Sequence, residues 1–149
     1  MYLFDDEEKR KQLKEILDSW IGTPFRHRSG VKGLGVDCAH FIACVMEEMG
    51  ILRWRKNLIP DYPHDWHLHN TRELFKESIE KELPVELISI DDVRDGDIVL
   101  LHYGKAASHG AIYFEGYLFQ AMERVGVCRL WMKEKSLMKR IRYVYRVRA

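Results

Sequence analysis

Cysteine is scarce in this chain of 149 residues, and the three that occur, Cys38, Cys44 and Cys128, form no CxxC pair. An odd and widely spaced set argues against a disulfide framework and against a zinc knuckle, which leaves a reduced thiol available for chemistry. No apolar run approaches the ~18 residues of a membrane span, and residues 1–14 are charged, unlike a secretory signal. We therefore expect a protein that is cytoplasmic as synthesised, unless something else exports it.

The chain also lacks an excess of charge of one sign, because 24 basic and 23 acidic residues leave a formal net charge of +1. Such a balance gives none of the field that is typical of a nucleic-acid-binding protein. Residues 124–148 are locally basic, but Val144, Tyr145 and Val147 interleave with the charges. This pattern favours the solvated face of a C-terminal strand, and a contact surface for an anionic polymer is the alternative.

Hydrophobic spacing divides the chain into a helical first half and a strand-rich second half. A chain of this length fits one domain, residues 1–149, without internal repeats. The glycine-containing loop 23–36 matches neither a P-loop nor a dinucleotide fingerprint, and we expect it to form a flexible wall. The predicted helices cover residues 5–20, 38–49 and 71–81, and the predicted strands cover 98–101, 110–114, 117–122, 125–131 and 141–147.

This order predicts an α+β domain in which N-terminal helices pack on an antiparallel sheet of five to six strands, or on a partial barrel. Glu115 and Gly116 lie between two of the predicted strands and are a hairpin signal. We expect the later strands to follow one another as a meander.

Cys38 is the first residue of the second predicted helix, and Asp37 precedes it as the candidate N-cap. The partial positive end of a helix dipole and the unpaired backbone N–H groups there favour thiolate over thiol. A cysteine in this position can therefore be a nucleophile. Cys44 and Cys128 have no such environment, and we interpret them as packing residues.

His109 begins an apolar strand, where it is either a core histidine satisfied by a carbonyl or a proton acceptor beside the thiol. Gln120 lies eleven residues later, across the Glu115–Gly116 turn, so antiparallel pairing can bring its amide near the imidazole. The amide oxygen can accept from one ring nitrogen and leave the other facing the thiol. Cys38, His109 and Gln120 are thus a candidate catalytic triad, although Gln120 could equally face solvent.

Five short blocks, in order and in spacing, resemble the NlpC-type cell-wall peptidases, which are papain-like cysteine hydrolases. The resemblance covers roughly residues 16–122. The blocks are WIGTPFRH at 20–27, GVDCAHFI at 35–42, DGDIV at 95–99, SHGAIY at 108–113 and FQA at 119–121.

The resemblance implies a cysteine peptidase or amidase that cleaves amide bonds of peptidoglycan stem peptides, typically next to D-glutamate or a diamino acid. It assigns Cys38 as nucleophile, His109 as general base and Gln120 as the group that orients the imidazole. It requires no cofactor and no metal. The candidates for the substrate and oxyanion site are Phe25, His27, Asp37, His40 and Ser108.

The chain departs from the family pattern at several positions. Ala39 and His40 follow the cysteine where Ser-Gly is usual, and Gln120 stands where histidine is common. Phe25 replaces a tyrosine that is thought to help the oxyanion site, and it cannot donate a hydrogen bond. Because loss of one oxyanion donor typically costs ~10²–10³ in rate, His40 or His27 would have to substitute for it.

These departures leave two further hypotheses open. One is a catalytically weak binding or assembly module of the same fold, and the other is a thiol acyltransferase or esterase. The lack of a signal peptide and of a wall-binding repeat suggests a phage or prophage enzyme that acts at the cell wall, or a cytoplasmic muropeptide hydrolase. The sequence does not indicate an oligomeric state.

A cluster of imidazole and carboxylate side chains between residues 62 and 69 invites a metal interpretation. It has no separate partner with recognised spacing, so we interpret it as substrate wall or structural. Trp54 and Trp66 could line such a wall, although packing against the helices is the simpler role. The cluster consists of His64, Asp65, His67 and His69.

Overall fold

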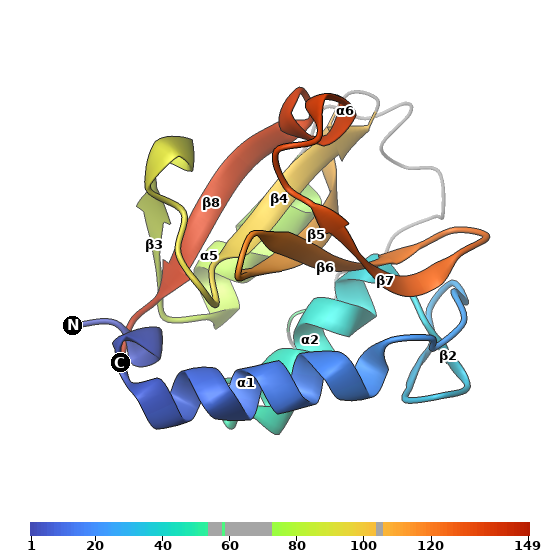
Figure 1. Cartoon of the computed structure of the whole chain (residues 1–149), viewed down its shortest axis with the longest axis horizontal. Coiled ribbons are helices and arrows are strands. Elements are labelled where there is room, and N and C mark those ends of the chain that lie inside the picture. The colour runs from blue at the N-terminus through green and yellow to red at the C-terminus, as the bar shows by residue number, and fades with distance from the viewer. Residues whose placement is uncertain (54–57, 59–72, 104–105) are drawn as a thin grey trace.

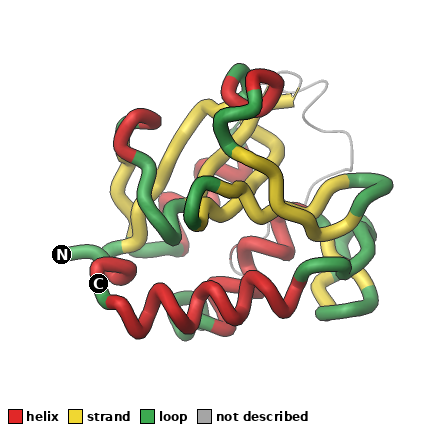
Figure 2. Tube along the Cα trace, in the orientation of Figure 1, coloured by secondary structure: helices red, strands yellow, loops and turns green. Residues whose placement is uncertain are grey.

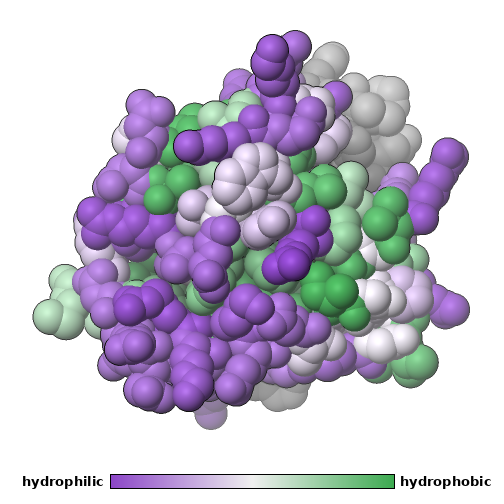
Figure 3. Space-filling view, viewed as in Figure 1, coloured by the Kyte–Doolittle hydropathy of each residue, from purple (hydrophilic) through white to green (hydrophobic). Residues whose placement is uncertain are grey.

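The computed structural model describes residues 1–53, 58, 73–103 and 106–149, and the first long helix within them lies along one side of the molecule (Figure 1). This helix, α1 (Glu7–Trp20), begins where the Asp6 side chain accepts the backbone N–H of Lys9 at 3.1 Å. Its buried residues Leu13, Leu17 and Trp20 recur at helical spacing. The outer side of α1 carries the hydrophilic side chains that cover the lower part of Figure 3.

The second helix, α2 (Cys38–Glu48), lies between α1 and the sheet (Figures 1 and 2). Seven of its 11 residues are buried, as its apolar sequence requires, and it contacts the middle of the sheet. Helix α5 (Leu74–Glu82) buries Phe75 and Ile79 in the same core. The expected helices at 5–20, 38–49 and 71–81 are therefore confirmed, with shifts of a few residues at their ends.

The sheet has six antiparallel strands in the order β3-β8-β4-β5-β6-β7 and is not closed into a barrel. This confirms the expected fold class. Glu115 and Gly116, with φ of 48° and 92°, form the expected tight turn between two of the strands. The strands are β3 (Val85–Ile88), β4 (Ile98–Tyr103), β5 (Ala106–Phe114), β6 (Tyr117–Met122), β7 (Gly126–Trp131) and β8 (Ile141–Val147).

The expected meander is correct for β4 to β7 but wrong for the last strand. Strand β8 returns across the sheet and pairs with β4 on one side and with β3 on the other. Strand β3 was not predicted, because its short, half-buried sequence has no clear alternation. The return of β8 also brings the two termini together, and the Ala149 N–H donates to the Met1 carbonyl at 3.1 Å.

Each face of the central strands is covered by its own core. Ile98 and Leu100 of β4 face the larger core, which contains the helices α1, α2 and α5. Val99 and Leu101 face a smaller core closed by α6 (Lys135–Met138) and by the segment around η2 (Ile90–Asp92). A strand buried on both faces has the continuous apolar run seen in the sequence at 98–101.

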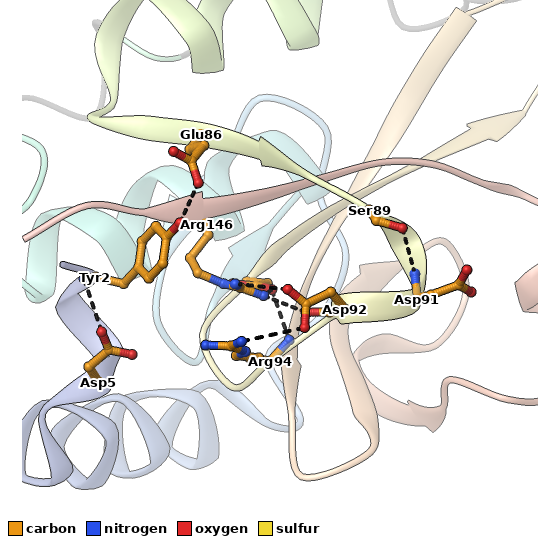
Figure 4. Close-up of polar contacts among 9 residues, drawn as sticks. Tyr2, Asp5, Glu86, Ser89, Asp91, Asp92, Arg94 and Arg146 are labelled. Carbon is orange, nitrogen blue, oxygen red and sulfur yellow. Dashed lines mark hydrogen bonds and ion pairs between the residues drawn. The ribbon is translucent and has the colours of Figure 1, made fainter.

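Arg146 corrects the interpretation of the basic C-terminal stretch as a wholly solvated face. Its side chain is only 6% exposed and forms an ion pair with Asp97 at 3.0 Å. It forms a second ion pair with Asp92 at 3.4 Å (Figure 4). The guanidinium also lies over the ring of Tyr2. This basic residue therefore joins β8 to the turn before β4 instead of facing a partner.

The glycine-containing loop differs from its expected form, and the imidazole and carboxylate cluster is not described. The loop 23–36 is partly ordered as a small hairpin of β1 (Gly30–Val31) and β2 (Gly35–Val36), which the sequence pattern did not indicate. The cluster His64, Asp65, His67 and His69, with Trp54 and Trp66, lies outside the described residues. No helix in the described part of the chain is both long and apolar enough to span a bilayer.

Candidate active site

The start of α2 is built around the carboxylate of Asp37, which is 2% exposed. One oxygen accepts the backbone N–H of His40 at 2.8 Å, and the other accepts the N–H of Arg28 at 2.7 Å. Burial by itself would raise the pKa of Asp37, but the hydrogen bonds from His40 and Arg28 outweigh it and lower the pKa. The predicted N-cap is confirmed, and it places a fixed negative charge next to Cys38.

The thiol of Cys38 does not have the lowered pKa that the helix position led us to expect. Burial raises the pKa of Cys38 to about 12, and the Asp37 carboxylate contributes to the rise. Backbone N–H groups of Gly110, Ala39 and Cys38 act in the opposite direction without compensating. The resting residue is therefore a neutral thiol, and burial together with the charge of the cap overrides the dipole of the helix.

The contact between Gly110 and the thiol follows from a split in the sheet. Pairing between β5 and β6 extends only from Ile112 to Phe114, so the first half of β5 separates from β6. Helix α2 contacts both strands there. A Cβ atom at Gly110 would lie 3.0 Å from Phe75 and 3.2 Å from Ile42, which is tighter than ordinary van der Waals contact, so these side chains would have to shift to accept it.

His109 and Gln120 meet across the same split. The Nε2 of His109 lies 2.6 Å from the Oε1 of Gln120, and Gln120 is completely buried. Because an amide oxygen only accepts, Nε2 carries the proton and Nδ1 is the acceptor nitrogen. Burial lowers the pKa of His109, and the hydrogen bond to Gln120 raises it by less. The imidazole is therefore neutral near pH 7, with a defined tautomer.

The amide of Gln120 is satisfied on one side only. Its Nε2 is buried and, among the described residues, has no hydrogen-bond partner. An unpaired buried amide of this kind costs about 1–3 kcal/mol. The other polar atom of the same amide, Oε1, accepts from Nε2 of His109.

The remaining candidates have different surroundings in the structure. His40 and His27 both approach Asp37, with Nδ1 atoms at 2.7 Å and 3.8 Å from its oxygens. Phe25 packs against the core of the helices and forms a bridge with the β2 strand. Ser108 lies in β5, where the register with β4 shifts. The first two residues thus gather on the cap, while Phe25 has a packing role.

Tyr103 is a site residue that the sequence analysis missed. Its ring meets the ring of His109 edge to face, with centroids 5.6 Å apart and an interplanar angle of 86°. The alternation of side chains along β4 could have indicated this contact. Leu101 pairs with His109, and Tyr103, two residues later, lies on the same face of β4 as Leu101. The end of β4 lay beyond the predicted strand 98–101, so this relation was not visible.

The sequence matches the NlpC/P60 family over residues 22–146. The fold is shared with a Staphylococcus aureus subsp. aureus Mu50 structure described as similar to lipoprotein, NLP/P60 family, at 19% identity and a TM-score of 0.67. That match covers 97% of this chain and 43% of the other, so the chain spans less than half of that protein. No match to a curated protein sequence was found.

Two isolated domains match over nearly their whole length. The NlpC/p60 domain of the peptidoglycan hydrolase SagA is 15% identical, with a TM-score of 0.61 and coverage of 91% of this chain and 96% of that one. The P60 domain of an antigen from M. avium subspecies paratuberculosis is 17% identical, with a TM-score of 0.61 and coverage of 95% and 94%. The chain belongs to the NlpC/P60 family, whose members are generally peptidoglycan hydrolases of the cysteine peptidase or amidase type.

Proposed function

We propose that this protein is a cysteine peptidase or amidase that hydrolyses amide bonds in peptidoglycan stem peptides. The observation that carries the proposal is the 2.6 Å hydrogen bond between His109 and Gln120, formed where the adjacent residue Gly110 lies against Cys38. Family membership supplies the substrate class, and the geometry supports a role for each residue. Cys38 is the nucleophile, His109 the general base and Gln120 the group that orients the imidazole.

The pKa shifts support a mechanism that starts from a neutral pair. Nδ1 of His109 takes the thiol proton as Sγ of Cys38 bonds to the carbonyl carbon, which forms a tetrahedral oxyanion and an imidazolium. The imidazolium then donates that proton to the departing nitrogen as the C–N bond breaks, leaving a thioester. Water, deprotonated by His109, attacks the thioester, and the proton returns to Sγ as the C–S bond breaks.

The Gln120 oxygen contributes most when His109 is charged. A hydrogen bond to an ionised partner is about twice as strong as a neutral one, so the bond to Nε2–H strengthens as the imidazolium forms. The backbone N–H of Cys38, at the first position of α2, is the natural oxyanion donor. Phe25 cannot provide a second one, and we propose that His40 or His27, which are held by Asp37, supplies it.

A binding or assembly module remains the second candidate, because the raised pKa of Cys38 and the presence of Phe25 both reduce reactivity. Digestion of a synthetic stem peptide that contains D-glutamate and a diamino acid, followed by mass spectrometry, separates the two functions. We expect cleavage by the natural protein and none by Cys38→Ala. A folded natural protein that binds the peptide without cleaving it would instead establish the binding module.

A further inference from the structure

We propose that Tyr103 is a positioning residue whose ring holds the imidazole of His109 in its productive orientation and shields that imidazole from water. The proposal deepens the proposed function and rests on it for the role of His109. It starts from the edge-to-face contact between the two rings, with centroids 5.6 Å apart. Contacts of this geometry are favourable beyond the area that they bury, because the positive edge of one ring meets the negative face of the other.

The backbone holds Tyr103 against His109 through an irregularity in the sheet. Leu101 pairs with His109, whereas His102 pairs with Ala107 and Tyr103 with Ala106, so β5 has one extra residue at this point. A bulge of this kind increases the local twist and redirects side chains, and such bulges are common next to active sites. Here it lies immediately before His109.

Arg140 also contacts the ring of Tyr103. Its guanidinium carbon lies 4.2 Å from the centroid of the Tyr103 ring, and its Nη1 lies 3.4 Å from the carbonyl oxygen of His102. The N–H of His102 in turn donates to the carbonyl of Arg140 at 2.8 Å. The arginine is therefore held to the backbone of β4 in two places. Arg140, Tyr103, His109 and Gln120 form a continuous row that ends at the buried amide.

The electrostatics favour a role for the ring rather than for a phenolate. Burial raises the pKa of Tyr103, Arg140 lowers it, and a charge on Cys38 raises it again. Tyr103 is thus neutral at working pH and lies near enough to Cys38 to respond to its ionisation. The same burial that Tyr103 helps to create lowers the pKa of His109.

Removal of the ring should therefore change both orientation and titration of His109. In the described residues, several titratable or charged side chains lie on the elements packed around His109. They are Asp37 and Cys38 at the start of α2, His102 and Tyr103 on β4, Cys128 on β7 and Arg140 before β8. Within each test the compared samples differ only at the substituted residue, because Cys38→Ala is common to all samples of the titration.

The kinetic test compares Tyr103→Phe, which keeps the ring, with Tyr103→Leu, which removes it. We expect Tyr103→Phe to retain kcat within about 3-fold and Tyr103→Leu to lower kcat by about 10-fold or more with KM little changed, because orientation acts in the transition state. Arg140→Gln, at the exposed end of the row, should lower kcat by about 2- to 5-fold, since it removes the cation–π contact with the ring and the Nη1 contact with the His102 carbonyl while leaving the ring in place.

The second readout does not require activity. In a Cys38→Ala background, NMR titration of the His109 imidazole should give a lowered pKa, unchanged in Tyr103→Phe and raised toward 6.5 in Tyr103→Leu. In the active protein, the acid limb of kcat/KM should move to higher pH by the same amount.

An unaltered His109 pKa and kcat in Tyr103→Leu overturns the proposal. So does a Tyr103→Phe variant as impaired as Tyr103→Leu, which would assign the role to the hydroxyl. If the Tyr103→Leu substitution prevents folding, wild-type kcat and His109 pKa in Arg140→Gln overturn the proposal. Failure of the natural protein to cleave stem peptides would refute the proposed function, while the titration still decides the role of Tyr103.

Discussion

Substitution of Gln120 by leucine should separate catalysis from stability. The change leaves the Nε2–H of His109 without an acceptor, which costs about 1–3 kcal/mol for a buried group. It also removes the unpaired Nε2 of Gln120, which recovers a similar amount. Because leucine and glutamine are similar in size, the free energy of unfolding should change by less than about 1 kcal/mol.

In catalysis, no gain offsets the loss of the hydrogen bond to His109. In the proposed mechanism the Gln120 oxygen stabilises the imidazolium that exists only during reaction, and the lost interaction of about 1–3 kcal/mol corresponds to a decrease in kcat/KM of about 5- to 150-fold. The assay is steady-state cleavage of the stem peptide, with urea denaturation measured on the same samples. Gln120→His offers a matched control, because an imidazole nitrogen can also accept from Nε2–H and should retain more activity than leucine. Activity of Gln120→Leu within about 2-fold of the natural protein would refute the orienting role.

Three further outcomes follow from the described contacts. Arg146→Leu leaves the carboxylate of Asp97 buried and unpaired, and should lower the free energy of unfolding by about 3–5 kcal/mol in urea denaturation; a loss below about 1 kcal/mol would contradict the buried pairing. Gly110→Ala forces β5 away from α2 and should cost about 1–3 kcal/mol in stability together with a larger proportional loss of kcat/KM, whereas wild-type kinetics would show that the close approach is unnecessary. In a pH profile, kcat/KM should rise with pH through a midpoint below 6.5, because burial lowers the pKa of the base His109. Iodoacetamide should label Cys38 slowly at pH 7, since burial and the Asp37 carboxylate raise the pKa of the thiol. A midpoint above 6.5, or rapid labelling, would contradict the neutral pair.

The sequence was sufficient to predict the elements that carry the site. Cys38 at a helix start and the Glu115–Gly116 turn are local features, which are determined by the residues that neighbour them in the sequence. The turn then brings Gln120 within reach of His109 by antiparallel pairing, and the two side chains meet at 2.6 Å in the structure. These relations need no knowledge of distant packing.

Other features depend on contacts between distant segments and could not be predicted in this way. The return of β8 between β3 and β4 is a property of the whole sheet, and so is the burial of Arg146 against Asp97. The direction of the pKa shift at Cys38 was also missed, because a helix position indicates the dipole but does not reveal the extent of burial. Tyr103 was missed because the predicted strand ended at Leu101, so the alternation that places Tyr103 on the same face of β4 as Leu101 was not visible.

The central claim is that Cys38 and His109 together hydrolyse an amide bond of a stem peptide. The most direct test is digestion of that peptide in water enriched in heavy oxygen, with the products identified by mass spectrometry. The account predicts cleavage by the natural protein, with one heavy oxygen in the new carboxyl group, and no cleavage by Cys38→Ala or by His109→Ala. An intact peptide after incubation with the folded natural protein, or cleavage by either variant at the rate of the natural protein, would contradict it.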